Sequence, residues 1–172
     1  MSLELLTAPV PIEVGHDVSA FHSGVCSLDE WLQKRALKNE KASVSRTYVT
    51  CEENKVVGYY CLSAGAVALR EAPKKMTRNM PDPIPVLVMG RLAVDQRYQN
   101  KGLGKALLLD ASRRTIQAGD IAGVAALLVH ALSEEARRFY LSRGFLESPV
   151  QPMTLCMRLA DAREILASRG KT

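Results

Sequence analysis

Apolar side chains recur at helix-like spacing in some segments and at strand-like spacing in others, as in a mixed α/β domain. In residues 27–37 a serine is followed three positions later by a glutamate and then by apolar residues at helical spacing. This predicts a capped helix that buries Trp31 and Leu32. Residues 46–51 and 56–63 are rich in β-branched and aromatic side chains and flank a polar turn, which predicts a β-hairpin.

Two later segments are apolar on both faces, as expected for central strands of a sheet. They are residues 86–94 and 124–131. Between them lie a loop with two glycines at 99–104 and a stretch with apolar residues at helical spacing. This order predicts a βαβ unit with a right-handed crossover.

The end of the chain predicts one more helix, a strand and a tail. Ser133 is a suitable N-cap with acids in the following turn, and Gly144 suits the position that ends the helix. Residues 153–159 predict a final strand. A length of 172 residues suits one core. We therefore expect a single domain over residues 1–160 and a polar tail over 161–172.

Composition excludes several classes of protein. The chain is 47% apolar and 24% charged, which excludes a collagen, a low-complexity polymer and a mostly disordered chain. It has no run of apolar residues long enough to span a membrane and no signal-peptide pattern, so we expect a soluble cytoplasmic protein with no membrane partner. The scattered cysteines predict core residues and no metal site; they are Cys26, Cys51, Cys61 and Cys156.

Positive charge is concentrated in the first half of the chain. The net charge is +5, yet residues 34–46 hold five basic residues against one acid and residues 70–80 hold four against one. Such clusters favour a surface that binds a polyanion, although solvated lysine-rich faces give the same pattern. The candidate contacts are Lys34, Arg35, Lys38, Lys41, Arg46, Lys74, Lys75 and Arg78.

The loop at 99–104, Q-N-K-G-L-G, is the strongest chemical signal. Free amides at the start of a helix bind anions, and glycines allow a phosphate to approach the backbone closely. The loop is neither a Walker A motif nor a G-x-G-x-x-G fingerprint. A glycine turn that only packs a helix against a strand would look similar, so the loop alone leaves both interpretations open.

With its surroundings, the loop resembles the acetyl-CoA loop of the GCN5-related N-acetyltransferase (GNAT) family, [QR]-x-x-G-x-[GA]. Residues 136–145, A-R-R-F-Y-L-S-R-G-F, are similar to the later helix of that family, A-x-x-[FL]-Y-x-x-x-G-F. The resemblance spans residues 46–159. It implies an α/β (α+β) GNAT fold, in which a mixed, mostly antiparallel sheet is flanked by helices and a splayed parallel strand pair binds acetyl-CoA.

The resemblance also implies roles for single residues. Acetyl-CoA is the implied co-substrate, with no metal. The Val94 amide would polarise the acetyl carbonyl, and Tyr140 would protonate the departing thiolate. Without the family, Tyr140 is interpreted as a core aromatic residue. The implied cofactor-binding residues are Leu92, Ala93, Val94, Gln99, Asn100, Lys101, Gly102, Leu103, Gly104, Lys105, Leu132 and Glu135.

Further segments resemble a narrower group, the TacT-type toxins of bacterial toxin–antitoxin pairs. They are residues 21–32, 45–49, 58–65 and 78–86, and the last, R-N-M-P-D-P-I-P-V, is unusual for generic GNAT enzymes. Such toxins acetylate the α-amino group of aminoacyl-tRNA and so stop translation. The resemblance implies a bacterial cytoplasmic homodimer and a ribbon-helix-helix antitoxin. Operator DNA would be bound only through that antitoxin, in a repressor complex.

No general base is predicted, because His16, His22 and His130 lack a recognisable carboxylate partner in the sequence. This suits an α-amine, which titrates near about 7.7–8.0, better than a lysine near about 10.4. Two alternatives stay open: a GNAT enzyme that acetylates a protein N-terminus or a small amine, and a non-catalytic CoA- or RNA-binding module. The sequence does not define which aminoacyl-tRNAs are preferred.

Overall fold

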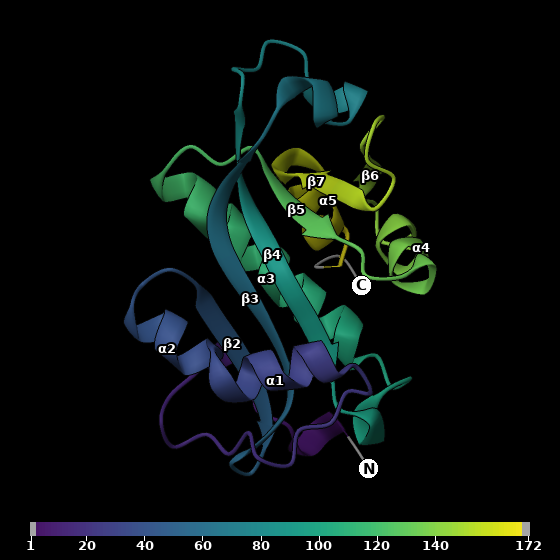
Figure 1. Ribbon diagram of the computed structural model, residues 1–172. Coiled ribbons are helices and arrows are strands. Elements are labelled where there is room, and N and C mark those ends of the chain that lie inside the picture. Colours follow the sequence, from purple (N-terminus) through teal and green to yellow (C-terminus); the bar gives the residue numbers. More distant parts are fainter. Residues whose placement is uncertain (1–2, 170–172) are drawn as a thin grey trace. The chain divides into compact units, whose positions relative to one another are not determined.

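The computed structural model describes residues 3–169 (Figure 1). These residues form two compact units, and each unit is built from two stretches of chain. Of the described residues, 3–63 and 90–111 form the N-terminal unit, and 64–89 and 112–169 form the C-terminal unit.

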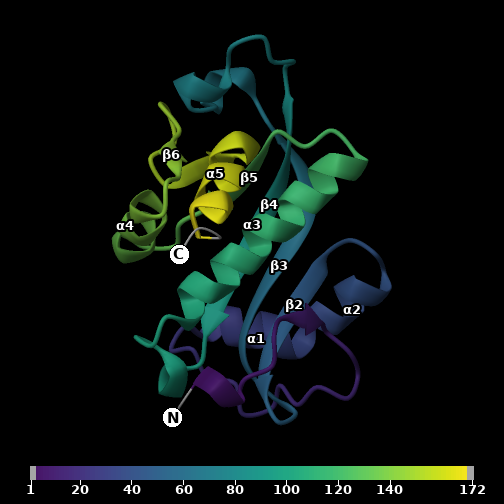
Figure 2. The ribbon, with the colours of Figure 1, turned by 180° about the vertical axis from the view of Figure 1, so that it is seen from behind.

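The N-terminal unit contains antiparallel strands with helices on both faces. Its elements are η1 (Leu3–Leu5), β1 (Val10–Pro11), α1 (Cys26–Lys34), α2 (Ala36–Lys41), β2 (Arg46–Glu52), residues 55–63 of β3 (Lys55–Val67), residues 90–94 of β4 (Ile84–Val94), η4 (Gln96–Tyr98) and residues 103–111 of α3 (Leu103–Ile121). The strands β2 and β3 form the predicted hairpin, with Tyr48 opposite Tyr60. Figures 1 and 2 show α1 and α2 on one face of these strands and the first half of α3 on the other.

Tyr59 is the centre of the core in this unit. It is fully buried, and its hydroxyl donates a hydrogen bond to the Leu28 carbonyl at 2.6 Å. Trp31 stacks on its ring at a centroid distance of 6.0 Å, and Phe21 packs edge-on at 5.6 Å. The predicted burial of Leu32 is confirmed, whereas Trp31 is only half-buried.

The predicted capping box is wrong. The first helix begins at Cys26 after Val25, which makes no side-chain cap, so Ser27 lies inside the helix. The polar contact at this end comes instead from Asp29, whose carboxylate accepts hydrogen bonds from the Ser23 amide at 3.0 Å and the Ser23 hydroxyl at 2.6 Å. A carboxylate one turn into the helix therefore holds the entering chain.

The C-terminal unit contains the predicted parallel strand pair. Its elements are residues 64–67 of β3, η2 (Leu69–Glu71), η3 (Lys74–Met76), residues 84–89 of β4, residues 112–121 of α3, β5 (Ala126–His130), α4 (Glu134–Ser142), β6 (Leu146–Glu147), β7 (Thr154–Arg158) and α5 (Leu159–Arg169). The strands β4 and β5 run parallel, with Val86 opposite Ala126 and Met89 opposite Val129. Helix α5 lies behind β5 and β7 in Figure 1 and in front of them in Figure 2.

Strand β7 pairs antiparallel with both β5 and β6, and the strand order of the whole sheet is β1-β2-β3-β4-β5-β7-β6. The prediction of a mixed, mostly antiparallel sheet with one parallel pair is confirmed. The predicted polar tail is helical through Arg169, and its residues 170–172 lie outside the described part of the chain.

The predicted ends of the helix after β5 are confirmed. The Ser133 hydroxyl accepts a hydrogen bond from the Ala136 amide at 3.1 Å, and Gly144 has a φ of +96°, the left-handed conformation expected after a helix. The Phe145 amide then donates to the Tyr140 carbonyl at 3.2 Å. These contacts fix the helix that carries Tyr140.

Three cysteines are buried as predicted, and burial raises the pKa of each thiol, that of Cys156 to about 12. Cys26 is exposed at the start of α1, so the prediction of a core position is wrong for it. Within residues 3–169, no group of acidic, histidine and cysteine side chains could hold a metal ion. No helix in that range is both long and apolar enough to cross a membrane.

Candidate active site

The loop between η4 and α3 carries the predicted phosphate-binding residues. Asn100 and Gly102 both have positive φ, 61° and 86°, so the chain turns twice before α3 begins at Leu103. A Cβ added to Gly102 would meet nothing within 4 Å, and one added to Gly104 would meet only a Val94 methyl at 3.9 Å. The space beside both glycines is therefore open, and a larger side chain would fill it.

The amides at the start of α3 provide hydrogen-bond donors beside this space. The Ala106 amide donates to the Gly102 carbonyl at 3.0 Å, so the helical bonds begin there. The preceding amides of Leu103, Gly104 and Lys105 have no acceptor within the helix. Free amides, two glycines and nearby lysines are the features that a pyrophosphate requires, so these residues fit acetyl-CoA.

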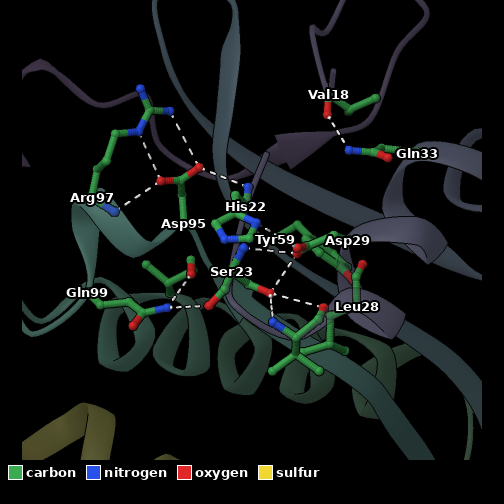
Figure 3. Close-up of polar contacts among 12 residues, drawn as sticks. Val18, His22, Ser23, Leu28, Asp29, Gln33, Tyr59, Asp95, Arg97 and Gln99 are labelled. Atoms are coloured by element: carbon green, nitrogen blue, oxygen red, sulfur yellow. Dashed lines mark hydrogen bonds and ion pairs between the residues drawn. The ribbon is translucent and has the colours of Figure 1, made fainter. Parts of the chain in front are cut away.

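Gln99 joins the loop to two neighbouring segments (Figure 3). Its side-chain amide donates to the Val94 carbonyl at the end of β4 and to the Ser23 carbonyl, both at 2.8 Å. Because both bonds go to protein carbonyls, this side chain positions the loop.

Asp95 fixes the turn that leads from β4 into the loop (Figure 3). Its buried carboxylate accepts hydrogen bonds from the His22 amide at 3.1 Å and from the Arg97 amide and guanidinium at 3.0 Å. Burial acts to raise the pKa of Asp95, but these hydrogen bonds outweigh it and hold the pKa below its ordinary value. Asp95 is therefore ionised, and it ties residues 21–25 to the base of the loop.

His22 has a carboxylate neighbour that the sequence did not reveal. Its Nδ1 lies 3.6 Å from Asp29 Oδ2, and its side chain is 65% exposed. The prediction that His22 lacks such a neighbour is therefore wrong, although 3.6 Å exceeds a hydrogen bond. His16 instead accepts from the Glu13 amide, and His130 Nδ1 lies 3.0 Å from the Thr154 hydroxyl.

The other predicted cofactor residues lie on β4, in the loop and after β5. On β4, Ala93 is buried and Leu92 and Val94 are half-buried. In the loop, Lys101 is exposed and Lys105 is half-buried. In the C-terminal unit, Leu132 is a 67% exposed hydrophobic residue and Glu135 is exposed in the first turn of α4.

Tyr140 is buried in the C-terminal unit, where α4 holds it. Its ring centroid lies 5.4 Å from that of Phe139 and 5.3 Å from that of Phe145. Burial raises the pKa of Tyr140 to about 12. Its side chain forms no hydrogen bond with any residue in the described range, so the protonated hydroxyl can donate to a ligand.

A pocket of about 340 Å³ lies beside the parallel strands of the C-terminal unit. Val67, Val88 and Leu128 supply apolar surface, and the last two are register partners on β4 and β5. Polar groups from Glu71 and His130 complete the lining together with Gln151 and Thr154. An apolar floor with a few polar groups suits a small organic group.

The two predicted basic clusters lie in different units. Lys34, Arg35, Lys38 and Lys41 are exposed on and between α1 and α2, and Arg46 is paired with Glu40 at 3.5 Å. The second cluster comprises Lys74, Lys75 and Arg78, all exposed on or just after η3.

Known proteins are similar to this chain in both sequence and fold. Residues 43–147 match the acetyltransferase (GNAT) domain. Over 160 residues the chain is 48% identical to the tRNA-acetylating toxin of Mycobacterium tuberculosis (strain ATCC 25618 / H37Rv), which covers 93% of this chain and 96% of that protein.

Two solved structures are also similar. AtaT complexed with acetyl-methionyl-tRNAfMet has a TM-score of 0.87 and 25% identity, covering 94% of this chain and 99% of that one. AtaTR bound with AcCoA has a TM-score of 0.82 and 26% identity, covering 95% and 99%. The predicted GNAT fold and the resemblance to the toxin group are confirmed. The chain belongs to the GNAT acetyltransferase family.

Proposed function

We propose that the protein is an acetyl-CoA-dependent N-acetyltransferase toxin that acetylates the α-amino group of aminoacyl-tRNA and so blocks translation. The observation that carries this proposal is the 48% identity to a tRNA-acetylating toxin across 93% of the chain. The open glycine loop and the unbonded Tyr140 hydroxyl supply the donor-side chemistry that such a reaction needs.

On the donor side, acetyl-CoA supplies the acetyl group as a thioester. The free amides of Leu103, Gly104 and Lys105 bind its pyrophosphate, with Lys101 beside them. Leu92 and Ala93 offer backbone groups to the pantetheine arm, and Leu132 and Glu135 contact it in the C-terminal unit. The Val94 amide donates to the acetyl carbonyl oxygen as negative charge develops there.

In the reaction, the neutral acceptor amine attacks the thioester carbonyl, a C–N bond forms and the C–S bond breaks. Tyr140 donates its proton to the departing sulfur, the amine loses its extra proton to solvent, and the Tyr140 phenolate takes a proton back from solvent. Burial makes Tyr140 a weaker acid than a free phenol, with a pKa of about 12. The same desolvated surroundings disfavour a thiolate anion, so proton donation becomes favourable when the C–S bond breaks.

On the acceptor side, the amine needs no strong base. An α-amino group has a pKa of about 7.7–8.0, so a sizeable fraction is neutral at physiological pH. The contacts of His16 and His130 agree with this, because their Nδ1 atoms meet the Glu13 amide at 2.9 Å and the Thr154 hydroxyl at 3.0 Å. His22 has the Asp29 carboxylate 3.6 Å from its Nδ1, beyond hydrogen-bond distance. The pocket beside Val88 and Leu128 is the place we propose for the amino-acid end of the tRNA.

The partners follow the toxin resemblance. A ribbon-helix-helix antitoxin would neutralise the protein and carry it to operator DNA, and the protein would act as a homodimer in the bacterial cytoplasm, where charged tRNA is found. The support is the R-N-M-P-D-P-I-P-V segment at residues 78–86 together with the similarity to a named toxin.

The decisive experiment combines the purified protein, acetyl-CoA and charged tRNA, followed by mass analysis of the amino-acid end. We expect the mass of one acetyl group on the α-amine of the esterified amino acid. Uncharged tRNA and a peptide with a free N-terminus serve as controls. Acetylation of the peptide alone would instead establish a generic GNAT enzyme.

A further inference from the structure

A second pocket, of about 420 Å³, lies in the C-terminal unit where η3, the end of α3 and the start of α5 meet. Among the residues of 3–169 that line it, four are basic, namely Lys75, Arg78, Arg158 and Arg163, and none is acidic. The basic clusters predicted from the sequence contained Lys75 and Arg78. Arg158 and Arg163 follow about 80 positions later in the chain and were not part of them. The fold therefore concentrates positive charge that the sequence leaves dispersed.

These basic side chains differ in how far neighbouring acids neutralise them. Arg158 forms two 2.8 Å hydrogen bonds to Asp161 and donates to the Lys75 carbonyl at 3.4 Å. These contacts make Arg158 a structural clamp that connects α5 to η3. Within residues 3–169, the ion pair of Arg163 is an exposed contact of 3.4 Å with Asp120, a kind of pair that holds a side chain weakly. Lys75 and Arg78 have no ion pair with any residue among 3–169, so three cationic groups can bind an anion.

The rest of the lining is apolar, which indicates a ligand with both charged and uncharged parts. Met76 and Leu159 are buried members of the lining, and Met80 is 40% exposed. A phosphate would satisfy the cations, and a flat heterocyclic base would cover the apolar surface. An unpaired nucleotide offers both groups at once, whereas a base inside a duplex is stacked and unavailable.

We propose that this pocket binds one unpaired nucleotide of the substrate tRNA, with its phosphate on Lys75, Arg78 and Arg163 and its base against Met80 and Leu159. This inference rests on the proposed function, which supplies the RNA substrate. The pocket then adds affinity for the body of the tRNA, apart from the groups that transfer the acetyl group.

The test compares two double variants with equal loss of charge. R78Q/R163Q neutralises two pocket cations and leaves the Arg158 clamp intact. K55Q/R113Q neutralises two exposed cations outside the pocket and serves as the matched control. Binding of uncharged tRNA is measured by fluorescence anisotropy across a salt series. Acetylation of an aminoacyl-adenosine ester, which lacks the rest of the tRNA, is measured in parallel.

We expect R78Q/R163Q to flatten the plot of log affinity against log salt by about 1, because the pocket holds one phosphate, with no change in K55Q/R113Q. M80A should weaken tRNA binding without changing the slope, because its contact is apolar. All variants should acetylate the small ester as the unaltered protein does.

An unchanged salt slope of tRNA binding in R78Q/R163Q overturns the pocket assignment. A variant that binds tRNA normally but no longer binds the antitoxin overturns it too, because the ligand of the pocket is then a protein segment. Failure of the unaltered protein to acetylate charged tRNA refutes the proposed function instead, so the two failures are distinguishable. Thermal unfolding of each variant confirms that the fold is retained.

Discussion

Tyr140 is enclosed by aromatic rings, and this enclosure determines its acidity. Phe139 and Phe145 hold the ring, and burial raises the pKa of the phenol to about 12. A core tyrosine would ordinarily satisfy its hydroxyl with a protein partner, as Tyr59 does with the Leu28 carbonyl. The Tyr140 hydroxyl has no such partner within residues 3–169, which favours a role toward a ligand.

Replacing Tyr140 with Phe removes the hydroxyl and keeps both ring contacts. If the hydroxyl delivers the proton, the acetylation rate on charged tRNA should fall by about 10² to 10⁴. Calorimetry should show nearly unchanged acetyl-CoA affinity, and the variant should no longer stop growth when expressed. Tyr48→Phe, which removes the hydroxyl of a half-buried tyrosine on β2, is the control. Near-normal turnover of Tyr140→Phe would assign the tyrosine to packing alone.

The raised pKa of Tyr140 also predicts the pH dependence of the reaction. A general acid must be protonated, and a phenol with a pKa of about 12 remains so across the usable pH range. The ester of an aminoacyl-tRNA withdraws electrons and lowers the pKa of the acceptor amine below the value of about 7.7–8.0 of an ordinary α-amino group. The rate should therefore rise as this amine loses its proton and then stay level to about pH 10. Initial rates on charged tRNA test this, with ester hydrolysis subtracted. A decline beginning near pH 9 would contradict a buried acid.

The loop before α3 has two features that a phosphate site needs. Its glycines leave open space, and hydrogen bonds of Gln99 and Asp95 fix its position. Gly104 is the better glycine for a test, since Gly102 has a positive φ and any replacement there strains the backbone. Gly104→Glu should abolish acetyl-CoA binding, because the carboxylate fills the open space and repels the pyrophosphate. Gly123→Glu, whose added Cβ meets nothing within 4 Å, should bind normally. Calorimetry of acetyl-CoA binding to the two folded variants tests this prediction.

The Gln99 side chain offers a finer test of the same loop. Gln99→Ala removes two hydrogen bonds to carbonyls but no atom that blocks the phosphate space. We expect acetyl-CoA affinity to fall about tenfold, equivalent to about 1.4 kcal/mol, which is the size of one to two net hydrogen bonds. Gln33→Ala also removes an exposed bond to a carbonyl, that of Val18, and should have no effect. Equal affinity in both variants would show that the loop holds its shape without Gln99.

The sequence predicted elements whose signals are local. Two apolar runs defined β4 and β5, and the Ser133 and Gly144 signals defined the ends of α4. The two-residue strands β1 and β6 were missed, because so short a pairing depends on the neighbouring strand. Ser27 failed as a cap for a different reason, since the helix begins at Cys26 and the polar contact at this end joins Asp29 to Ser23.

The candidate site was predictable only where a motif is continuous in sequence. The glycine loop and the helix of Tyr140 could be found in this way. The Asp95 contact with the His22 amide and the gathering of Arg158 and Arg163 around Lys75 join positions more than 70 residues apart, and no local pattern encodes them. Long-range polar contacts of this kind can be identified only from the folded structure.

Across the entire chain, basic charge is presented by two separate units. In the N-terminal unit, the lysines of α1 and α2 are exposed, whereas Arg46 is compensated by Glu40. A tRNA is a long polyanion, and phosphate contacts add to binding largely independently of sequence. If both units bind the same RNA, their contributions to the salt dependence should add.

The variant K34Q/K38Q tests this with two exposed lysines that lie four positions apart across the end of α1 and the start of α2. The plot of log tRNA affinity against log salt should flatten by about 2, one for each lysine that contacts its own phosphate, and joining K34Q/K38Q to R78Q/R163Q should add the losses of the two pairs. Acetyl-CoA affinity should not change, because neither lysine is near the glycine loop in sequence or among its hydrogen-bond partners. A slope that changes only with the C-terminal pair would confine RNA binding to that unit. The lysines of α1 and α2 would then be solvated surface residues, which is the alternative interpretation that the sequence left open.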